Sequence, residues 1–260
     1  MIIDTHIHIY PCYRLEQALG VFLDRFAGEP AATPRVACLA ERFDCDFYHR
    51  IRERKAGLSE FAVTDEKDGR YLALRRLADG QGMYLLPGRQ VISSENIEVL
   101  ALCCNTMLDD GLPAAEIIKA VRAREGVPVV AWSPGKWFGA RGKVVDNLLE
   151  RFSPADFLLG DTSLRPLGWA EPLLMRKAEK LGYRIVHGSD PLPFAGEEQR
   201  FGYYASRIEN GAENQAPDIL LRSLPDNSKI SIMPIGRRSS PLDLFGRLKK
   251  NAASKQVSTP

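Results

Sequence analysis

The chain has 260 residues, of which 45% are hydrophobic and 26% are charged. This length and composition fit a single soluble globular domain that is long enough to bury a core. The 35 Lys and Arg residues nearly balance the 33 Asp and Glu residues, for a formal net charge of +2. A charge this small excludes general attraction to nucleic acid or to a membrane, so any anion binding must be local.

The first predicted element is a strand from Ile2 to Ile9. Side chains alternate along a strand, so Asp4, His6 and His8 share one face. Two imidazoles spaced in this way can bind one or two divalent cations, with carboxylates from other strands completing the shell. Because this polar motif begins at residue 4, it leaves no room for a secretory signal. No apolar run reaches the roughly 18 to 20 residues that cross a bilayer, and a cytoplasmic protein is expected.

The next segments alternate between helical and extended patterns. Leu15 to Phe26 carries apolar residues at helical spacing, Val36 to Leu39 is a short strand, and Phe47 to Lys55 has helical character. Several short extended runs follow between Phe61 and Asn105, separated by Gly and Asp, which predicts strands with few helices. Pro113 to Arg124 has the start and stop signals of a helix.

The second half of the chain continues the alternation. Four buried-type strands are each followed by a polar or Gly/Pro-containing loop: Val127 to Ala131, Phe157 to Leu159, Ile185 to Val186 and Ile230 to Met233. Helices are expected near residues 142–151, 169–181 and 198–208. Such alternation implies a mostly parallel sheet, and about eight strands favour a closed barrel. We predict one distorted, TIM-like (β/α) barrel of seven or eight strands over residues 1–250, and a disordered tail over 251–260.

The five cysteines form no CxxC pair. In a protein without an export signal they are expected to be free, buried thiols.

In a barrel of this kind, the residues that follow the strands meet at one face. The candidates for that face are His6, His8, Glu41, Arg42, Arg89, Gln90, Ser133, Lys136, Asp161, Arg165, His187 and Asp190. His49 instead falls in a predicted helix, where a surface or capping role is expected.

Two motifs give the chain a family resemblance: Asp4-Thr5-His6-Ile7-His8 in the first strand, and Gly188-Ser189-Asp190 after a late strand. With Pro87-Gly88 and the extended run from Ser94 to Leu102, the chain resembles the polymerase-and-histidinol-phosphatase (PHP) family over roughly residues 1 to 195. The resemblance implies a distorted α/β barrel that binds up to three Zn, Mn or Fe ions and hydrolyses phosphate esters.

The chain departs from that family at several metal ligands. Where the family usually has Asp-His and Pro-Gly-x-Glu, this chain has Glu41-Arg42 and Pro87-Gly88-Arg89-Gln90. The family's later His-Pro and Asp-x-His correspond to Ser133-Pro134 and Asp190-Pro191-Leu192. We therefore expect a mononuclear or binuclear site instead of a trinuclear one. Its predicted metal ligands are His6, His8, Glu41 and Asp190, with Asp4, Glu95 or Glu98 as supporting groups or extra ligands.

The leading hypothesis is a metal-dependent hydrolase that acts on a small anionic ester, with a phosphate ester as the favoured case. Asp190, Glu41 and His187 are the predicted catalytic residues. Arg42, Arg89, Lys136 and Arg165 are the predicted substrate-binding residues, because Arg and Lys side chains at strand ends can surround an anion. Zn, Mn or Fe is the expected cofactor, and neither nucleic acid nor membrane is an expected partner.

Two alternatives remain open. One is a barrel that has lost its metals and binds an anionic metabolite without catalysis, in which His6 and His8 are hydrogen-bonded to Asp190. The other is an amidohydrolase-like metal-dependent hydrolase, a class that also opens with His-x-His and closes with a late-strand Asp.

Overall fold

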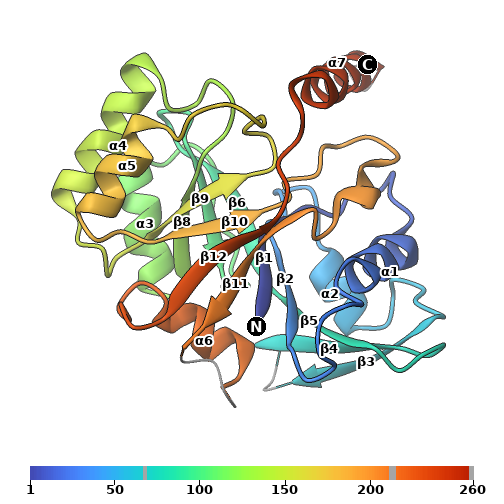
Figure 1. The fold of residues 1–260 in the computed structure, drawn as a ribbon. Coiled ribbons are helices and arrows are strands. Elements are labelled where there is room, and N and C mark those ends of the chain that lie inside the picture. The colour runs from blue at the N-terminus through green and yellow to red at the C-terminus, as the bar shows by residue number, and fades with distance from the viewer. Residues whose placement is uncertain (67–68, 211–214, 258–260) are drawn as a thin grey trace.

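The computed structural model describes residues 1–66, 69–210 and 215–257. Within these ranges the strands form two mixed sheets, one of seven strands and one of five. Figure 1 shows the two sheets with helices on their outer sides.

The seven-stranded sheet has the order β12-β11-β1-β2-β5-β4-β3. The strands β1, β2 and β5 run parallel, whereas β3, β4, β11 and β12 join by antiparallel pairing. Their bounds are β1 (Ile2–Ile7), β2 (Arg35–Leu39), β3 (Phe61–Glu66), β4 (Tyr71–Arg76), β5 (Gly82–Leu86), β11 (Tyr204–Glu209) and β12 (Ser231–Gly236).

The five-stranded sheet has the order β10-β9-β8-β7-β6. The strands β10, β9 and β8 are parallel, and β7 and β6 continue the sheet in antiparallel fashion. Their bounds are β6 (Gly88–Ile92), β7 (Glu98–Leu102), β8 (Val127–Ala131), β9 (Leu158–Thr162) and β10 (Ile185–Gly188).

The helices α1 to α5 cover the outer faces of the sheets. Apolar residues of α1 and α2 pack on the seven-stranded sheet, and those of α3, α4 and α5 pack on the five-stranded sheet. A third apolar core lies between the sheets and includes Ile3, Val36, Leu100, Val129 and Val186. The helix bounds are α1 (Leu15–Arg25), α2 (Phe47–Arg52), α3 (Ala114–Arg122), α4 (Gly139–Arg151), α5 (Leu173–Lys180), α6 (Pro217–Ser223) and α7 (Pro241–Val257), with a 3-10 helix η1 (Glu197–Arg200).

Each edge strand of the five-stranded sheet approaches an interior strand of the seven-stranded sheet at a glycine. A Cβ atom at Gly188 in β10 would collide with the Cβ and backbone of His6, and one at Gly88 in β6 would collide with the carbonyl oxygen of Leu39. Isolated hydrogen bonds join the edges: Asp190 N–H donates to the His6 carbonyl at 2.9 Å, and Gln90 N–H donates to the Glu41 carbonyl at 2.9 Å. These close approaches bring the end of β1 beside the end of β10.

The expected TIM-like barrel is wrong, because the strands form two separate sheets in place of a closed barrel. The physical reason lies in the connections between Phe61 and Leu102. The turns that join β3 to β4, β4 to β5 and β6 to β7 are too short to hold a crossover helix, so these strands pair antiparallel. The α/β character of the prediction is retained.

Two further segments differ from the sequence-based expectations. The predicted helix at 198–208 is wrong, since η1 ends at Arg200 and β11 follows, paired with β1 on one side and β12 on the other. The expected disordered tail begins inside α7, a helix that continues to Val257. The last three residues of that tail, 258–260, lie outside the described ranges.

The strand at the start of the chain and the helices expected from Leu15 and Pro113 are confirmed. The cysteines are free, as expected, with Cys12 exposed and the other four buried. Among the described residues, no helix is both long enough and apolar enough to span a membrane.

Candidate metal site

Two histidines and one aspartate meet where β1 lies beside β10. His6 is in β1, His8 follows its end, and Asp190 follows the end of β10. The Nε2 atoms of His6 and His8 are 3.0 Å apart, and each lies 3.7 Å from Oδ1 of Asp190. All three side chains are buried, and one potential ligand atom from each lies within 4.8 Å of the others. We call these three residues the His-Asp cluster.

The alternation of side chains along the first strand directs both imidazoles to this place. Ile7 and Ile9 pack into the core beneath α1, so His6 and His8 point to the opposite side, towards the second sheet. The sequence-based prediction that these imidazoles share one face agrees with this arrangement.

Asp4 forms hydrogen bonds with the backbone on both sides of the cluster. Its carboxylate is fully buried and accepts hydrogen bonds from the backbone N–H groups of Ser189 at 3.0 Å, His6 at 3.1 Å and Gly202 at 3.1 Å. Burial raises the pKa of Asp4 to about 6, although these hydrogen bonds act in the opposite direction. Asp4 therefore fixes the backbone on both sides of the cluster and does not belong to the ligand group itself.

The protonation state of His8 favours metal binding. Burial, together with the neighbouring His6 imidazole, lowers the pKa of His8 well below its usual range, so His8 is neutral at pH 7. Burial raises the pKa of Asp190, whereas His6 and Arg247 act to lower it. A neutral imidazole retains a free lone pair, which is the form that binds a metal ion.

The donor set fits a divalent transition metal. Imidazole nitrogens and a carboxylate oxygen are ligands of Zn, Mn and Fe, and three protein ligands with one open side are typical of catalytic metal sites. Two imidazoles whose Nε2 atoms face each other can share one hydrogen bond at most, whereas a cation could bind a lone pair of each ring.

The other ring nitrogen of each histidine has a different environment. The Nδ1 atoms of His6 and His8 are buried, and in the part of the chain that the structure describes they have no hydrogen-bond partner. Ligating imidazoles usually donate this second N–H to a carboxylate or carbonyl. Here the contacts that orient the rings lie on the Nε2 side, where Oε1 of Gln90 is 3.1 Å from Nε2 of His6.

A polar cavity of about 380 Å³ lies against the cluster. His8 and Asp190 form part of its wall, as do Gln90, Glu98, Ser133, Lys136 and Arg42. Nζ of Lys136 donates to Oδ1 of Asn96 at 2.5 Å and lies 3.8 Å from Oε1 of Glu98. Arg42 is paired with Asp44 at 3.7 Å, and its side chain is 38% exposed. The cavity therefore combines part of the His-Asp cluster with two cationic side chains.

Two residues predicted for the site, Glu41 and Arg89, form hydrogen bonds with neighbouring backbone groups. Oε1 of Glu41 accepts the backbone N–H of Tyr48 at 3.1 Å, in the first turn of α2. Arg89 donates to the carbonyl of Cys45 at 2.6 Å and to that of Arg42 at 3.1 Å. Neither side chain lines the cavity, so the structure does not bring Glu41 and Arg89 together with the His-Asp cluster.

His187 and Arg165 lie in a different place. Arg165 forms a buried ion pair with Asp161, with its Nη2 atom 2.5 Å from Oδ2 of that residue. Nδ1 of His187 is 2.9 Å from Oγ of Ser206, and the His187 ring packs edge-on against Tyr204. His187 and Arg165 line a separate cavity of about 520 Å³. The reason is again alternation, because Gly188 faces His6 and its neighbour His187 must face the other way.

The two glutamates predicted as supporting groups lie in different places. Glu98 lines the cavity but does not belong to the His-Asp cluster. Glu95 instead accepts the backbone N–H of Ala114 at the start of α3, at 3.0 Å.

Sequence reasoning missed the contribution of α7. Leu248 and Asn251 of this helix line the cavity, and Arg247 donates to the carbonyl of Asp190 at 3.2 Å. The spacing of Leu244, Arg247 and Asn251 at intervals of three and four residues could have indicated a helix with one inward face.

No protein-family model and no curated protein matches the sequence. The fold is similar to that of PsfC from Pseudomonas syringae PB-5123, with a TM-score of 0.58 and 14% identity over 98% of each chain. It is also similar to the lesion-specific endonuclease PfuEndoQ from Pyrococcus furiosus, with a TM-score of 0.52 and 13% identity. That match covers 90% of this chain and 58% of the endonuclease. At these identities the similarity concerns the fold alone.

Proposed function

We propose that the protein is a metal-dependent hydrolase of PHP-like type that acts on a small anionic ester, with a phosphate ester as the favoured substrate class. The observation that carries this proposal is the convergence of His6, His8 and Asp190 beside a polar cavity. The fold similarity to an endonuclease is compatible with hydrolysis of a phosphate ester.

His6, His8 and Asp190 would hold a Zn, Mn or Fe ion. Such an ion lowers the pKa of a bound water and polarises the ester that is cleaved. The three side chains leave the side that faces the cavity open for a substrate. Asp4 fixes the backbone of His6 and Ser189.

Lys136 and Arg42 would bind the anionic group of the substrate. Both cations lie on the cavity wall, and charge-assisted hydrogen bonds from Lys and Arg suit phosphate or carboxylate oxygens. A cavity of about 380 Å³ fits a small molecule, and the net charge of +2 offers little attraction to a nucleic acid. Glu98, which lies on the same wall 3.8 Å from Lys136, would be the carboxylate that exchanges a proton with the substrate.

The test compares the wild-type protein with His8→Ala and with His49→Ala as a matched control outside the cluster. Elemental analysis of protein purified without chelator should find Zn, Mn or Fe in the wild type and His49→Ala but not in His8→Ala. Hydrolysis of p-nitrophenyl phosphate should follow the metal content. Absence of bound metal and of any metal-dependent hydrolysis in the wild type would refute the proposal. Phosphate binding without metal would then favour the non-catalytic alternative.

A further inference from the structure

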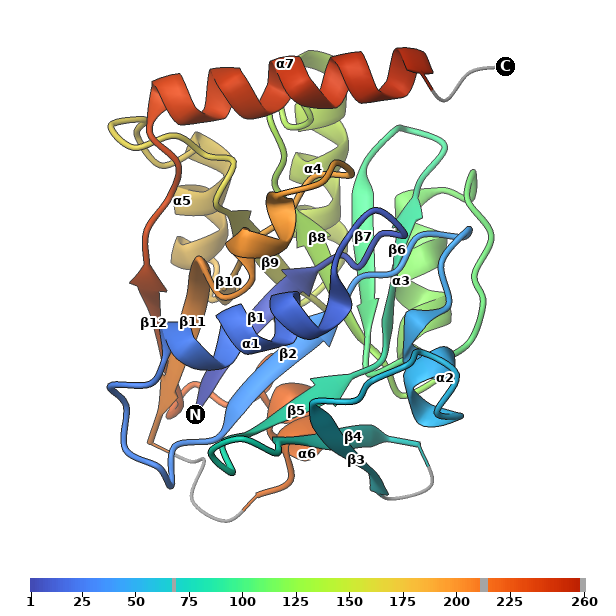
Figure 2. The same cartoon turned by 90° about the vertical axis from the view of Figure 1, so that its right-hand side faces the viewer.

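The C-terminal helix α7 lies across the ends of the strands. Figure 2 shows α7 along the top of the molecule, on the same side as the segment that follows β10. Leu248 and Asn251 of this helix form part of the wall of the cavity beside the His-Asp cluster. The inward face of α7 also includes Leu244, which packs with Leu164 and Leu192.

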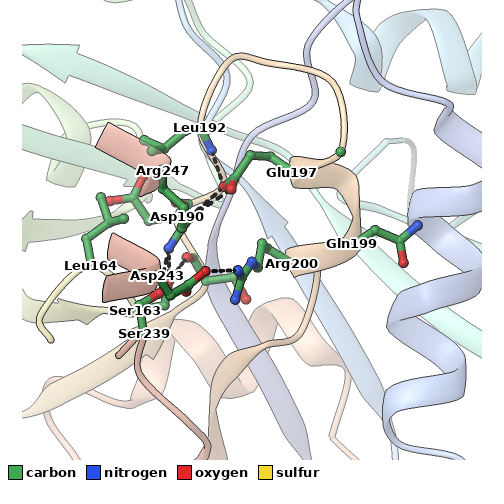
Figure 3. Close-up of polar contacts among 12 residues, drawn as sticks. Ser163, Leu164, Asp190, Leu192, Glu197, Gln199, Arg200, Ser239, Asp243 and Arg247 are labelled. Carbon is green, nitrogen blue, oxygen red and sulfur yellow. Dashed lines mark hydrogen bonds and ion pairs between the residues drawn. The ribbon is translucent and has the colours of Figure 1, made fainter. Parts of the chain in front are cut away.

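Arg247 is the buried charge that attaches α7 to the strand ends. Its Nε atom donates to Oε1 of Glu197 at 2.9 Å, and its Nη2 atom donates to Oε2 at 2.6 Å. Its Nη1 atom donates to the hydroxyl oxygens of Ser239 at 2.9 Å and Ser163 at 3.2 Å. Figure 3 shows these groups around the guanidinium. Arg247 therefore joins the segments that follow β9, β10 and β12 to one helix.

The remaining contact of Arg247 reaches the backbone of a cluster residue. Its Nη2 atom donates to the carbonyl oxygen of Asp190 at 3.2 Å. The backbone of Asp190 has φ +49°, in the left-handed region that few side chains other than Gly, Asn and Asp adopt. Its N–H donates to the carbonyl of His6 at 2.9 Å, so both peptide groups that flank this strained position are held.

Glu197 binds the guanidinium of Arg247 and also a backbone group that follows Asp190. Its Oε2 atom accepts the backbone N–H of Leu192 at 3.0 Å, and both Glu197 and Arg247 are buried. The Arg247–Glu197 ion pair therefore holds the backbone at both Asp190 and Leu192.

We propose that Arg247 is a positioning residue for the metal site and that docked α7 is an integral part of it. The guanidinium holds the Asp190 backbone so that its carboxylate faces His6 and His8. This inference rests on the proposed function for its metal readout. The expected consequence is that metal affinity depends on a residue that contacts none of the metal-binding atoms.

A second ion pair of α7 supplies a matched control. Nη2 of Arg200 lies 2.5 Å from Oδ1 of Asp243, so this pair also joins α7 to η1, without contact to Asp190. Loss of Arg200 weakens the attachment of the helix, whereas loss of Arg247 also releases the Asp190 carbonyl. The two variants separate positioning of the aspartate from general docking of α7.

The experiment measures the Kd for Mn²⁺ by calorimetry in the full-length wild type, Arg247→Met, Arg247→Lys and Arg200→Met. Removal of supporting residues around a metal typically weakens binding by about 10- to 100-fold, and we expect such a loss in Arg247→Met. We expect partial rescue in Arg247→Lys and less than about a 3-fold change in Arg200→Met. Unchanged affinity in Arg247→Met, or an equal loss in Arg200→Met, would overturn the proposal.

Two further measurements keep the inference testable. If Arg247→Met fails to fold, Arg247→Met/Glu197→Gln removes both buried charges while the amide can still accept the Leu192 N–H. If the wild type binds none of Mn²⁺, Zn²⁺ and Fe²⁺, the proposed function fails, and amide hydrogen exchange at Asp190 still decides the positioning role. Exchange there should accelerate at least about 10-fold in the Arg247 variant and not in Arg200→Met. Equal protection in both variants would contradict the positioning role.

Discussion

The His187 imidazole is buried beside the Tyr204 ring, with its Nδ1 atom hydrogen-bonded to Ser206. Burial lowers its pKa to about 4, although the charge of Asp161 acts in the opposite direction. The unperturbed pKa of histidine is about 6.5, so the unfolded chain binds this proton more tightly than the folded protein does. The neutral ring therefore contributes stability that is complete above pH 6.5 and is lost as the pH falls towards 4.

This residue gives a prediction about stability and pH. Between pH 7 and pH 4.5, the free energy of unfolding of the wild type should fall by about 2 kcal/mol more than that of His187→Asn, which lacks the titrating group. Urea unfolding at the two pH values measures the difference. Parallel losses in the two proteins would show that His187 does not have this depressed pKa in the folded state.

At the scale of elements, the His-Asp cluster depends on how closely β1 and β10 approach each other. Gly188 makes this approach possible, because an added Cβ would meet the backbone nitrogen of His6 at 2.7 Å as well as its side chain. The same contact sets the distance between His6 and Asp190, which lies two residues beyond Gly188. Packing of the strands and geometry of the cluster are therefore coupled.

Replacement of Gly188 by Ala should separate the strands. Overpacking of a tight core typically costs about 1–3 kcal/mol, and contact with backbone atoms places this change at the upper end of that range. Gly246→Ala in α7 is the control, since a Cβ there meets nothing within 4 Å and should stabilise the helix by up to about 1 kcal/mol. Thermal unfolding of both variants checks the prediction. A Gly188→Ala protein as stable as the wild type would disprove it.

At the scale of the whole molecule, a metal that binds only the folded state stabilises the entire chain. At a free metal concentration of 100 times the Kd, this linkage is worth about 2.7 kcal/mol. For a protein of this length, each kcal/mol raises the Tm by roughly 2–4 °C. Calorimetry with and without MnCl₂ should therefore show a rise of at least about 5 °C in the wild type. Asp190→Asn should show almost no rise, and an equal rise there would place the metal elsewhere.

Local pattern was sufficient to predict the elements nearest the site. Alternation along the first strand predicts that His6 and His8 share a face. Asp190 is proposed because it follows a late strand and because its Gly-Ser-Asp motif resembles that of the PHP family. Their meeting could not be derived from spacing, because it depends on β10 passing close to β1 at Gly188. The sequence pattern also could not show which way His187 points. Neighbouring residues of a strand face opposite sides, so an error of one residue places the side chain on the wrong face of the sheet.

The sequence by itself determined the α/β composition, the strand that carries the two imidazoles, and the small net charge. The tertiary structure alone decided that the strands form two sheets, that Glu41, Arg89, Arg165 and His187 lie apart from the cluster, and that α7 reaches the site. The physical reason is that side-chain periodicity is a local property, which one sequence encodes directly. Strand pairing and the docking of a distant helix depend on contacts between segments far apart in the chain, such as Arg247 with Asp190.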